Sequence, residues 1–395
     1  MIDKTKIKEY NSKCKRKRLQ KGGKVMKGFD YWTPVKIHFG TDVLSSLASY
    51  VPQGDVLLII DRVFAHGKVV EAIRKNLDRR IRIFTETDPN PSLENVRSAI
   101  AEARAQKTMT VIGLGGGSNM DVAKITACFA NNDRDFEEAL ASGNFQRTDV
   151  RLILIPTTAG TGSEVTNVGV FTDLQKNEKR PIRVDAFYAD DAFIDPALTF
   201  SMPKQVTANT GMDAFCHAIE AYWNKNSNPM SDAFAKEALA LIFANLKRAY
   251  DDPQDTEARE HMALASLLAG LAFSQTKTTA AHVFSYPITA MYHVAHGQGC
   301  AVSIAALIRH SVEKESKKMQ RLGAALGFAD VEALAHGCEQ LIESVSMSHR
   351  LSSLGAVEAD IDSLVRSSLT YEDQLASTPM TLNAETIRDL LKEIL

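Results

Sequence analysis

The chain lacks both a long apolar run and an excess of charge of either sign. Its 395 residues contain 46 Lys and Arg against 48 Asp and Glu, which gives a formal net charge of -2. A membrane helix needs about 20 consecutive apolar residues, and no stretch approaches that length. A near-neutral chain also gives no sign of a nucleic acid partner. The composition therefore argues against membrane and nucleic acid partners.

Cysteine is scarce, and its positions suggest no disulfide framework. The five residues are Cys14, Cys128, Cys216, Cys300 and Cys338. They form no C-x-x-C motif and no pairing pattern, which is typical of reduced thiols. We therefore expect a cytoplasmic protein.

The first 26 residues differ in composition from the rest. Lys13-Cys-Lys-Arg-Lys-Arg18 is basic, and the apolar segment of a secretory signal is missing. A basic run can bind nucleic acid or address a protein to the nucleus, although disordered tails of this kind are more frequent. We predict that residues 1–26 form a disordered extension and that Met26 is an alternative start.

The remaining chain divides into two predicted domains. Residues 27–195 alternate β-branched runs with helical patterns, as a doubly wound parallel sheet requires. In residues 196–395, alanine- and leucine-rich segments such as 232–249 and 257–273 have helical periodicity. The predicted fold is a Rossmann-like α/β domain followed by an all-α domain, with the active site between them.

Asp213 and His217 form half of a candidate metal site. They lie four residues apart in Gly211-Met-Asp-Ala-Phe-Cys-His-Ala-Ile-Glu-Ala-Tyr222, where no breaker follows Gly211. A helix would place both side chains on one face. Such a pair alone is more often a surface hydrogen bond, so a metal site needs further donors.

His282 and His296 supply these donors. They lie in an apolar stretch, where buried imidazoles need partners. Pro287 interrupts a helical run and Gly297 follows His296, so a kinked helix and a helix end could aim both rings at the first pair. Spacing alone does not choose between His296 and His293. One oxygen and three nitrogen donors suit iron(II) or zinc.

A glycine-rich turn, Gly113-Leu-Gly-Gly-Gly-Ser118, joins a β-branched strand to an amphipathic helix. Backbone amides in such a turn approach a pyrophosphate closely, with the positive end of the helix behind them. The turn only approximates the dinucleotide fingerprint, and a structural strand-to-helix turn is the alternative. The turn nevertheless indicates phosphate binding.

Two other predicted strands end in polar residues. The run Arg151–Pro156 is followed by hydroxyl groups on Thr157, Thr158, Thr161 and Ser163. Open α/β sheets bind ligands beyond such strand ends, although hydroxyl-rich loops also simply form turns. Asp61 could accept hydrogen bonds from an adenosine ribose, which favours NAD(H) over NADP(H); a surface acid is the alternative.

Together these motifs resemble the iron-containing, group III alcohol dehydrogenases, from about Lys27 to the C-terminus. Residues 115–124 and 156–166 resemble the family's cofactor loops, and residues 211–222 and 282–296 resemble its metal motifs. The resemblance implies the metal ligands Asp213, His217, His282 and His296, and so selects His296 over His293. It implies cofactor contacts from Asp61, Gly116, Gly117, Ser118, Asp121, Thr157, Thr158 and Lys179.

Tyr286 departs from the pattern that the resemblance implies. Many members carry a histidine there, four residues after the third ligand, near the nicotinamide or in a proton relay. Tyr286 could act as a hydroxyl relay, protons could move through water, or the tyrosine could simply pack.

Three short segments resemble a branch that reduces phosphonoacetaldehyde or similar anionic aldehydes. They are residues 223–230, 284–289 and 296–300. Lys277 is a candidate contact for the substrate anion, with a solvated lysine as the alternative. We therefore expect an NAD(H)-linked dehydrogenase acting on a small aldehyde or alcohol; the resemblance also implies a homodimer or larger assembly.

Two rival functions fit parts of the sequence. A dehydroquinate synthase-like lyase shares the expected two-domain plan but needs several basic residues for a phosphorylated sugar acid. A non-enzymatic metal-binding or scaffold protein leaves both phosphate-binding loops unexplained. Hydride transfer fits the motifs best.

We predict that a chain starting at Met26 keeps full turnover, because the motifs and the resemblance begin beyond that point. Steady-state kinetics of the full-length and shortened proteins, with the same aldehyde and NADH, test this. A large loss of turnover on truncation would contradict it.

Overall fold

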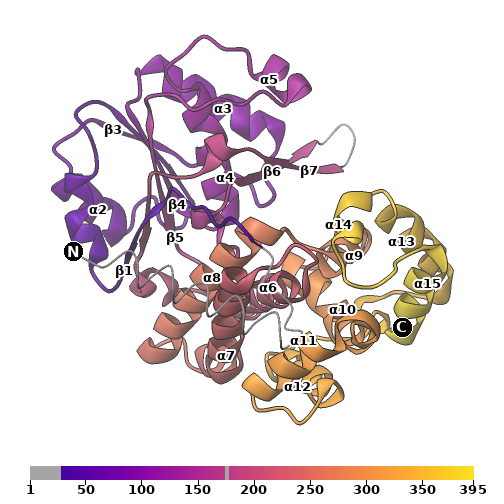
Figure 1. Ribbon diagram of the computed structural model, residues 1–395. Helices are drawn as coiled ribbons and strands as arrows, with labels where there is room; N and C mark the ends of the chain where they lie inside the picture. Colours follow the sequence, from indigo (N-terminus) through magenta and orange to yellow (C-terminus); the bar gives the residue numbers. More distant parts are fainter. Residues whose placement is uncertain (1–27, 174–177) are drawn as a thin grey trace, which may run out of the picture. The chain divides into compact units, whose positions relative to one another are not determined.

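The computed structural model describes residues 28–173 and 178–395 (Figure 1). Residues Thr33–Leu395 form one compact unit. The predicted disordered extension, residues 1–26, lies outside the described residues.

A parallel sheet of six strands, in the order β1-β8-β5-β4-β2-β3, organises the first part of this unit. Its strands are β1 (Lys36–Phe39), β2 (Val56–Ile60), β3 (Ile81–Phe84), β4 (Thr110–Gly115), β5 (Arg151–Pro156) and β8 (Asp191–Ile194). All residues of β2 and β4 are buried, as expected for strands covered on both faces.

Helices cover both faces of this sheet. They are α2 (Lys68–Asn76), α3 (Leu93–Ala105), α4 (Gly117–Phe129) and α5 (Phe136–Ser142), with the short 3-10 helices η1 (Val43–Ser49), η2 (Ser163–Val165) and η3 (Asp185–Phe187). Val56, Leu58 and Ile60 of β2 pack with η1 and α2, whereas Leu57 and Ile59 pack with α3 and α4. The predicted doubly wound α/β arrangement is confirmed.

The strand register brings three polar sequence motifs to one edge of the sheet. Ile60 lies opposite Leu114, and Gly115 lies opposite Pro156. The residues that follow these parallel strands therefore share the carboxyl edge of the sheet: they are Asp61, Gly116 and Thr157.

An antiparallel hairpin also lies in this part and was not predicted. It consists of β6 (Val168–Asp173) and β7 (Glu178–Arg183). Residues of β6 alternate between half-buried and buried, and Gly169 lies against Phe187 and Ile125 of α4. The hairpin therefore packs one face against α4.

Every regular element described after Ile194 is helical. These elements are η4 (Pro196–Thr199), α6 (Lys204–Trp223), α7 (Pro229–Asp251), α8 (Thr256–Thr276), α9 (Ala280–Tyr292), α10 (His296–His310), α11 (Val312–Ala325), α12 (Val331–Ser344), η5 (Ser352–Leu354), η6 (Glu358–Asp360), α13 (Ile361–Ser368), α14 (Glu372–Ala376) and α15 (Ala384–Glu393). The all-α prediction for this part is confirmed.

The helix boundaries expected around Pro287 and Gly297 were wrong in detail. Pro287 lies inside α9 without ending it, and α9 ends before His293, whose φ is 54°. His296 is the first residue of α10, so Gly297 belongs to the first turn of a helix rather than to a helix end. Gly297 is required by space, because a Cβ there would lie 1.9 Å from the backbone oxygen of Asn209.

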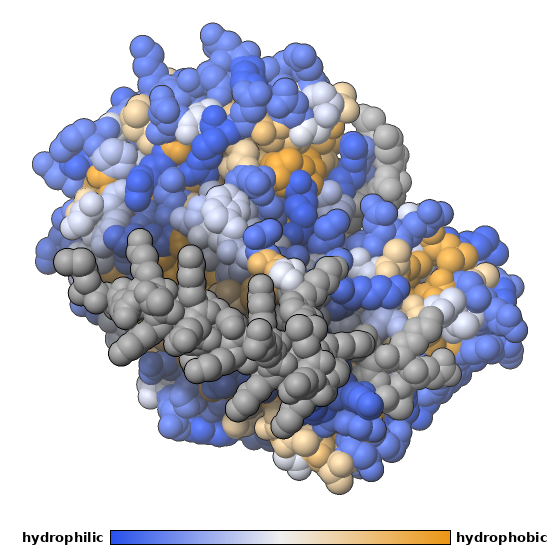
Figure 2. All heavy atoms as spheres, in the orientation of Figure 1, coloured by the Kyte–Doolittle hydropathy of each residue, from blue (hydrophilic) through white to orange (hydrophobic). Residues whose placement is uncertain are grey.

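No helix in the described ranges is long and apolar enough to cross a membrane. Figure 2 shows that hydrophilic side chains cover most of the visible described surface, with smaller apolar patches between them.

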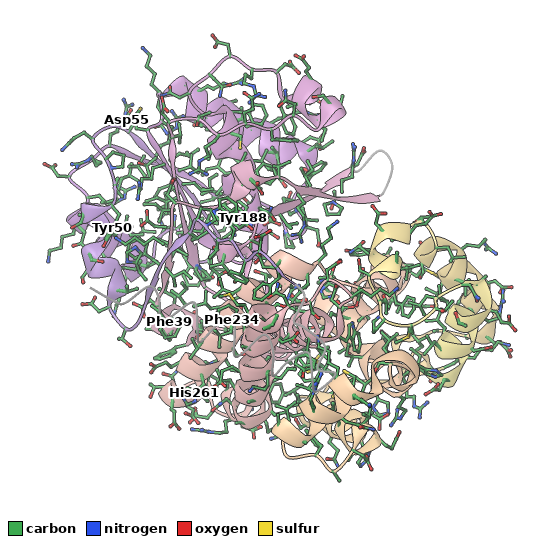
Figure 3. All side chains as sticks on the ribbon, in the orientation of Figure 1. Phe39, Tyr50, Asp55, Tyr188, Phe234 and His261 are labelled. Atoms are coloured by element: carbon green, nitrogen blue, oxygen red, sulfur yellow. The ribbon has the colours of Figure 1, made fainter. Side chains whose placement is uncertain are left out.

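Helix α8 joins the two parts of the unit. Its residues Ala263, Leu267 and Leu271 pack in the core of the α/β part, while the opposite face packs among the other helices. Phe234 of α7, labelled in Figure 3, packs against both cores. The sheet and the helical part are therefore held together by apolar packing, without a linker between them.

Candidate metal and nucleotide sites

Three of the predicted metal ligands, all histidines, lie around one carboxylate oxygen of the fourth, Asp213. Oδ1 of Asp213 lies 3.9 Å from Nε2 of His217, 3.5 Å from Nε2 of His282 and 3.7 Å from Nε2 of His296. Donor atoms bound tetrahedrally to one cation at about 2.1 Å are about 3.4 Å apart. The distances of His282 and His296 are therefore close to those in a formed metal site. His217 lies further from Asp213 and is not in the group of donors that all lie within 4.8 Å of one another.

Burial leaves two atoms of this cluster without partners. The side chains of Asp213, His217 and His282 are buried, while that of His296 is 33% exposed. Neither Oδ1 of Asp213 nor Nε2 of His282 has a hydrogen-bond partner. A buried polar atom left this way costs about 1–3 kcal/mol, and more when charged. A divalent cation bound between these atoms would remove that cost, so the residues fit a metal.

Burial and charge act differently on each group of the cluster. Burial alone would lower the pKa of His282, but Cys300, Glu220 and Asp213 outweigh it and raise that pKa well above its usual value. Burial lowers the pKa of His217 to about 4, so its ring is neutral and its nitrogen lone pair is available. Burial opposes ionisation of Asp213, but the rings of His217, His282 and His296 hold the pKa of that carboxyl well below its usual value. The cluster thus combines an ionised carboxylate with a neutral imidazole.

Glu220 orients His282, a role that the sequence reasoning missed. Its Oε1 accepts hydrogen bonds from Oγ1 of Thr279 (2.7 Å) and the backbone N of Ala281 (2.8 Å). Its Oε2 is hydrogen-bonded to Nδ1 of His282, which leaves Nε2 facing Asp213. Carboxylates commonly orient metal-bound histidines in this way. Spacing offered a signal, since Asp213, His217 and Glu220 follow an i, i+4, i+7 pattern.

Cys300 is a second residue that the sequence reasoning left out. Its Sγ lies 3.7 Å from Nε2 of His296. Donor atoms of Asp213, His282, His296 and Cys300 all lie within 4.8 Å of one another. Cys300 follows His296 by four residues on α10, the same spacing that joins Asp213 to His217.

The predicted phosphate-binding turn is shaped by glycine. Gly115 has a φ of 153°, and a Cβ there would lie 2.5 Å from Nδ2 of Asn119. Helix α4 starts after Gly116 with no side chain capping it, so its first amide groups have no side-chain acceptor. A helix start of this kind suits a phosphate group.

The second predicted cofactor loop lies against this turn. A Cβ on Gly116 would lie 3.7 Å from Thr158, and one on Gly117 would lie 3.0 Å from Thr161. Oγ1 of Thr158 is buried without a partner, and the backbone N of Thr157 donates to the oxygen of Gly115. The two loops thus form one polar surface beside the start of α4.

Asp121 and Ser163 are engaged within the protein. Oγ of Ser163 donates to Oδ1 of Asp121 (2.7 Å), and the backbone N of Val170 donates to Oδ2 (3.0 Å). Nζ of Lys124 donates to Ser163 (2.6 Å), and burial lowers the pKa of Lys124 to about 8. This network joins α4 to η2 and the hairpin.

The other predicted cofactor residues lie near the same edge. Oδ1 of Asp61 accepts a hydrogen bond from the backbone N of Val63, and Oγ of Ser118 accepts one from the backbone N of Asn90. Lys179 belongs to β7, but its side chain lies outside the described part of the protein.

A backbone contact connects the second cofactor loop to the metal cluster. Nδ1 of His217 lies 3.4 Å from the backbone oxygen of Gly160. A Cβ on Gly160 would lie 2.6 Å from the backbone oxygen of Thr210, so the loop lies directly on α6. The structure thus brings the candidate metal cluster next to the second cofactor loop.

Tyr286 lies beside the candidate metal cluster, whereas Lys277 is exposed at the end of α8. The Tyr286 ring lies nearly parallel to that of His296, with centroids 6.4 Å apart, and its hydroxyl accepts a hydrogen bond from Gln374. Lys277 is exposed and follows α8 with a φ of 73°, and its backbone oxygen accepts a hydrogen bond from Asn224. Tyr286 therefore adjoins the exposed ligand of the cluster.

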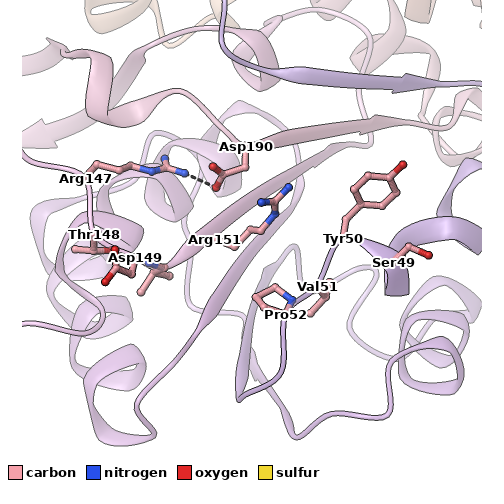
Figure 4. Close-up of a pocket in the computed structure, with 10 residues that line it drawn as sticks. Ser49, Tyr50, Val51, Pro52, Arg147, Thr148, Asp149, Arg151 and Asp190 are labelled. Carbon is pink, nitrogen blue, oxygen red and sulfur yellow. Dashed lines mark hydrogen bonds and ion pairs between the residues drawn. The ribbon is translucent and has the colours of Figure 1, made fainter.

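A hollow of about 540 Å³ lies elsewhere, at the amino ends of β5 and β8 (Figure 4). Arg147 and Arg151 line it and form ion pairs with Asp190 and Asp191. This edge is opposite to the one that carries the glycine-rich turn, so the hollow is separate from the candidate site.

The fold and the cluster together define a metal-dependent dehydrogenase. The model for "Iron-containing alcohol dehydrogenase" matches residues 34–196, and that for "Fe-containing alcohol dehydrogenase family, C-terminal" matches residues 207–395. The chain belongs to the iron-containing alcohol dehydrogenase family and is an oxidoreductase of that class. The resemblance inferred from the motifs is confirmed.

Individual relatives cover nearly the whole chain. Long-chain-alcohol dehydrogenase 1 of Geobacillus thermodenitrificans is 34% identical over 90% of this chain and 94% of its own. A 1-propanol dehydrogenase of Salmonella typhimurium is 34% identical over 86% and 93%. The crystal structure of sulfoacetaldehyde reductase from Bifidobacterium kashiwanohense, in complex with NAD+, has a TM-score of 0.89 at 32% identity over 93% and 99%.

We predict that Glu220→Gln lowers the affinity for zinc by about 10- to 100-fold, because the neutral amide holds the His282 ring less firmly. Competition with a chromophoric chelator measures this. Glu164→Gln is the matched control, because Glu164 is also a buried carboxyl but belongs to η2. Equal affinities of Glu220→Gln and the unaltered protein would contradict the orienting role.

Proposed function

We propose that the protein interconverts small aldehydes and primary alcohols with NAD(H), and that its substrates include anionic aldehydes such as sulfoacetaldehyde and phosphonoacetaldehyde. The convergence of three imidazole nitrogens on the unpartnered oxygen of Asp213 carries the proposal. The similarity to a sulfoacetaldehyde reductase solved with NAD+ supports the substrate class and the cofactor.

The proposed metal ligands are Asp213, His217, His282 and His296, and the proposed metal is iron(II) or zinc. When bound, such a cation supplies Lewis acidity toward a carbonyl or hydroxyl oxygen. The ligands stay in place because three helices position them and Glu220 orients His282. His296 is the exposed ligand, so substrate approaches from its side and meets Tyr286 there.

The proposed cofactor residues bind the dinucleotide at the carboxyl edge of the sheet. Amide groups at the start of α4 and the hydroxyl group of Thr158 hold the phosphates, and Asp61 accepts the ribose hydroxyls. When bound, NAD(H) supplies or accepts the hydride. Asp121 and Ser163 contribute by keeping α4 against η2.

In this proposal Tyr286 transfers a proton and Lys277 binds the anionic group of the substrate. The Tyr286 hydroxyl, held by Gln374, passes a proton between substrate and solvent. The ammonium group of Lys277 attracts the sulfonate or phosphonate of an anionic aldehyde. Both roles concern the exposed side of the metal cluster.

The proposal also covers the domain boundaries, the assembly and the cellular location of the protein. We assign residues 27–195 and 196–395 to the nucleotide and metal domains, and we infer a homodimer or larger assembly in the cytoplasm. The comparisons favour alcohol dehydrogenase chemistry over the lyase of the dehydroquinate synthase kind.

We predict that NADH is consumed with aldehydes and that sulfoacetaldehyde and phosphonoacetaldehyde have a higher kcat/KM than propanal. Anaerobically purified protein, with its metal content measured, is assayed through NADH absorbance. Lys277→Gln should raise KM for the anionic aldehydes and leave that for propanal unchanged. No preference for the anionic aldehydes would refute the substrate class, and no NADH consumption with any aldehyde would refute the reaction.

We predict that His282→Ala abolishes turnover while NADH binding survives, because the change removes a metal ligand and leaves the residues of the proposed phosphate-binding turn unaltered. Turnover and NADH fluorescence titration measure the two effects. His293→Asn is the matched control, since His293 has a left-handed backbone that Asn tolerates. Wild-type turnover in His282→Ala would overturn the ligand assignment.

A further inference from the structure

We propose that the thiolate of Cys300 binds the same cation as Asp213, His282 and His296, so that the centre has a sulfur donor. This inference rests on the metal centre of the proposed function. It adds a sulfur donor to the predicted set of one oxygen and three nitrogens.

The distances match a shared cation. Bonds of about 2.1 Å to nitrogen and 2.3 Å to sulfur, set about 90° to 120° apart in a five-coordinate centre, separate the two donors by about 3.1 to 3.8 Å. Sγ of Cys300 lies 3.7 Å from Nε2 of His296. The sulfur also lies within 4.8 Å of the donor atoms of Asp213 and His282.

The helix explains why this sulfur faces the cluster. His296 and Cys300 are one turn apart at the start of α10, so their side chains share a face. Gly297 and Gly299 bring that turn close to its neighbours: a Cβ at Gly297 would lie 1.9 Å from Asn209, and one at Gly299 would lie 2.8 Å from Thr289. Close packing of α10 therefore places Cys300 beside Asp213 and His282.

Packing alone does not account for this cysteine. A buried cysteine often serves as a small apolar group, and Cys300 is fully buried. Here, however, its sulfur lies within 4.8 Å of a donor atom of Asp213 and one of His282, and each of these residues has a buried polar atom with no hydrogen-bond partner. Of the cysteines in the described residues, Cys300 is the one that lies within this group of donors.

Charge balance agrees with a thiolate ligand. Asp213 contributes one negative charge, and a Cys300 thiolate contributes a second. Together they offset the two positive charges of a divalent cation, whereas neutral imidazoles add none. No lysine or arginine ion pair with Asp213 is found among the described side chains.

The first test uses cobalt(II), added alone to chelator-treated full-length protein. A sulfur ligand gives an intense near-ultraviolet charge-transfer band, which oxygen and nitrogen ligands lack. We expect this band in the unaltered protein and in Cys216→Ser, whose buried thiol neighbours His217. Cys300→Ser should bind cobalt(II) without the band.

The outcomes separate this inference from the function it rests on. Cobalt(II) bound without the band in the unaltered protein would overturn the role of Cys300 and leave the metal centre standing. Failure to bind cobalt(II) stoichiometrically would overturn the metal centre itself, and the role of Cys300 with it.

A second measurement needs no variant and therefore does not depend on the folding of one. X-ray absorption of the unaltered zinc protein should show one sulfur neighbour at about 2.3 Å. Only oxygen and nitrogen neighbours would overturn the proposal.

Discussion

The structure depends on a buried carboxylate oxygen that has no partner of its own. Oδ1 of Asp213 lies among three imidazole nitrogens, and the adjoining Nε2 of His282 is also unpartnered. Glu220 adds a second buried carboxylate, held by His282 and Thr279. Without a cation, this polar cluster would be costly to bury among apolar helices. Metal binding and the packing of α6, α9 and α10 are therefore coupled.

Glycine sets how closely the second cofactor loop approaches the helices. Gly162 of that loop and Gly270 of α8 are in backbone contact, since a Cβ on Gly162 would lie 2.5 Å from the Cα of Gly270. Gly160 lies equally close to Thr210 of α6. Larger residues would push the loop away from both helices. The loop that adjoins the glycine-rich turn therefore also adjoins the candidate metal cluster.

Local patterns predicted much of this arrangement, and contacts between distant segments explain what was missed. The four-residue spacing of Asp213 and His217 requires only a helix, and the apolar runs of β4 and β5 require only a buried parallel sheet. Glu220 and Cys300 lie on the same helical faces as predicted ligands, yet their places beside the cluster depend on contacts with His282 of α9. The place of Gly297 at the start of α10 depends on close packing against Asn209, which no local pattern records.

The polar residues of the second cofactor loop divide into two structural groups. Ser163 and Asp121, together with Lys124, join α4 to η2 through hydrogen bonds that are all internal. Thr158, by contrast, has a buried hydroxyl with no partner beside the start of α4. A hydroxyl-rich loop thus supplies both the bonds that position a helix start and a free hydroxyl for what binds there. Because this loop also contacts His217 through Gly160, the start of α4 and the metal cluster are positioned by one segment.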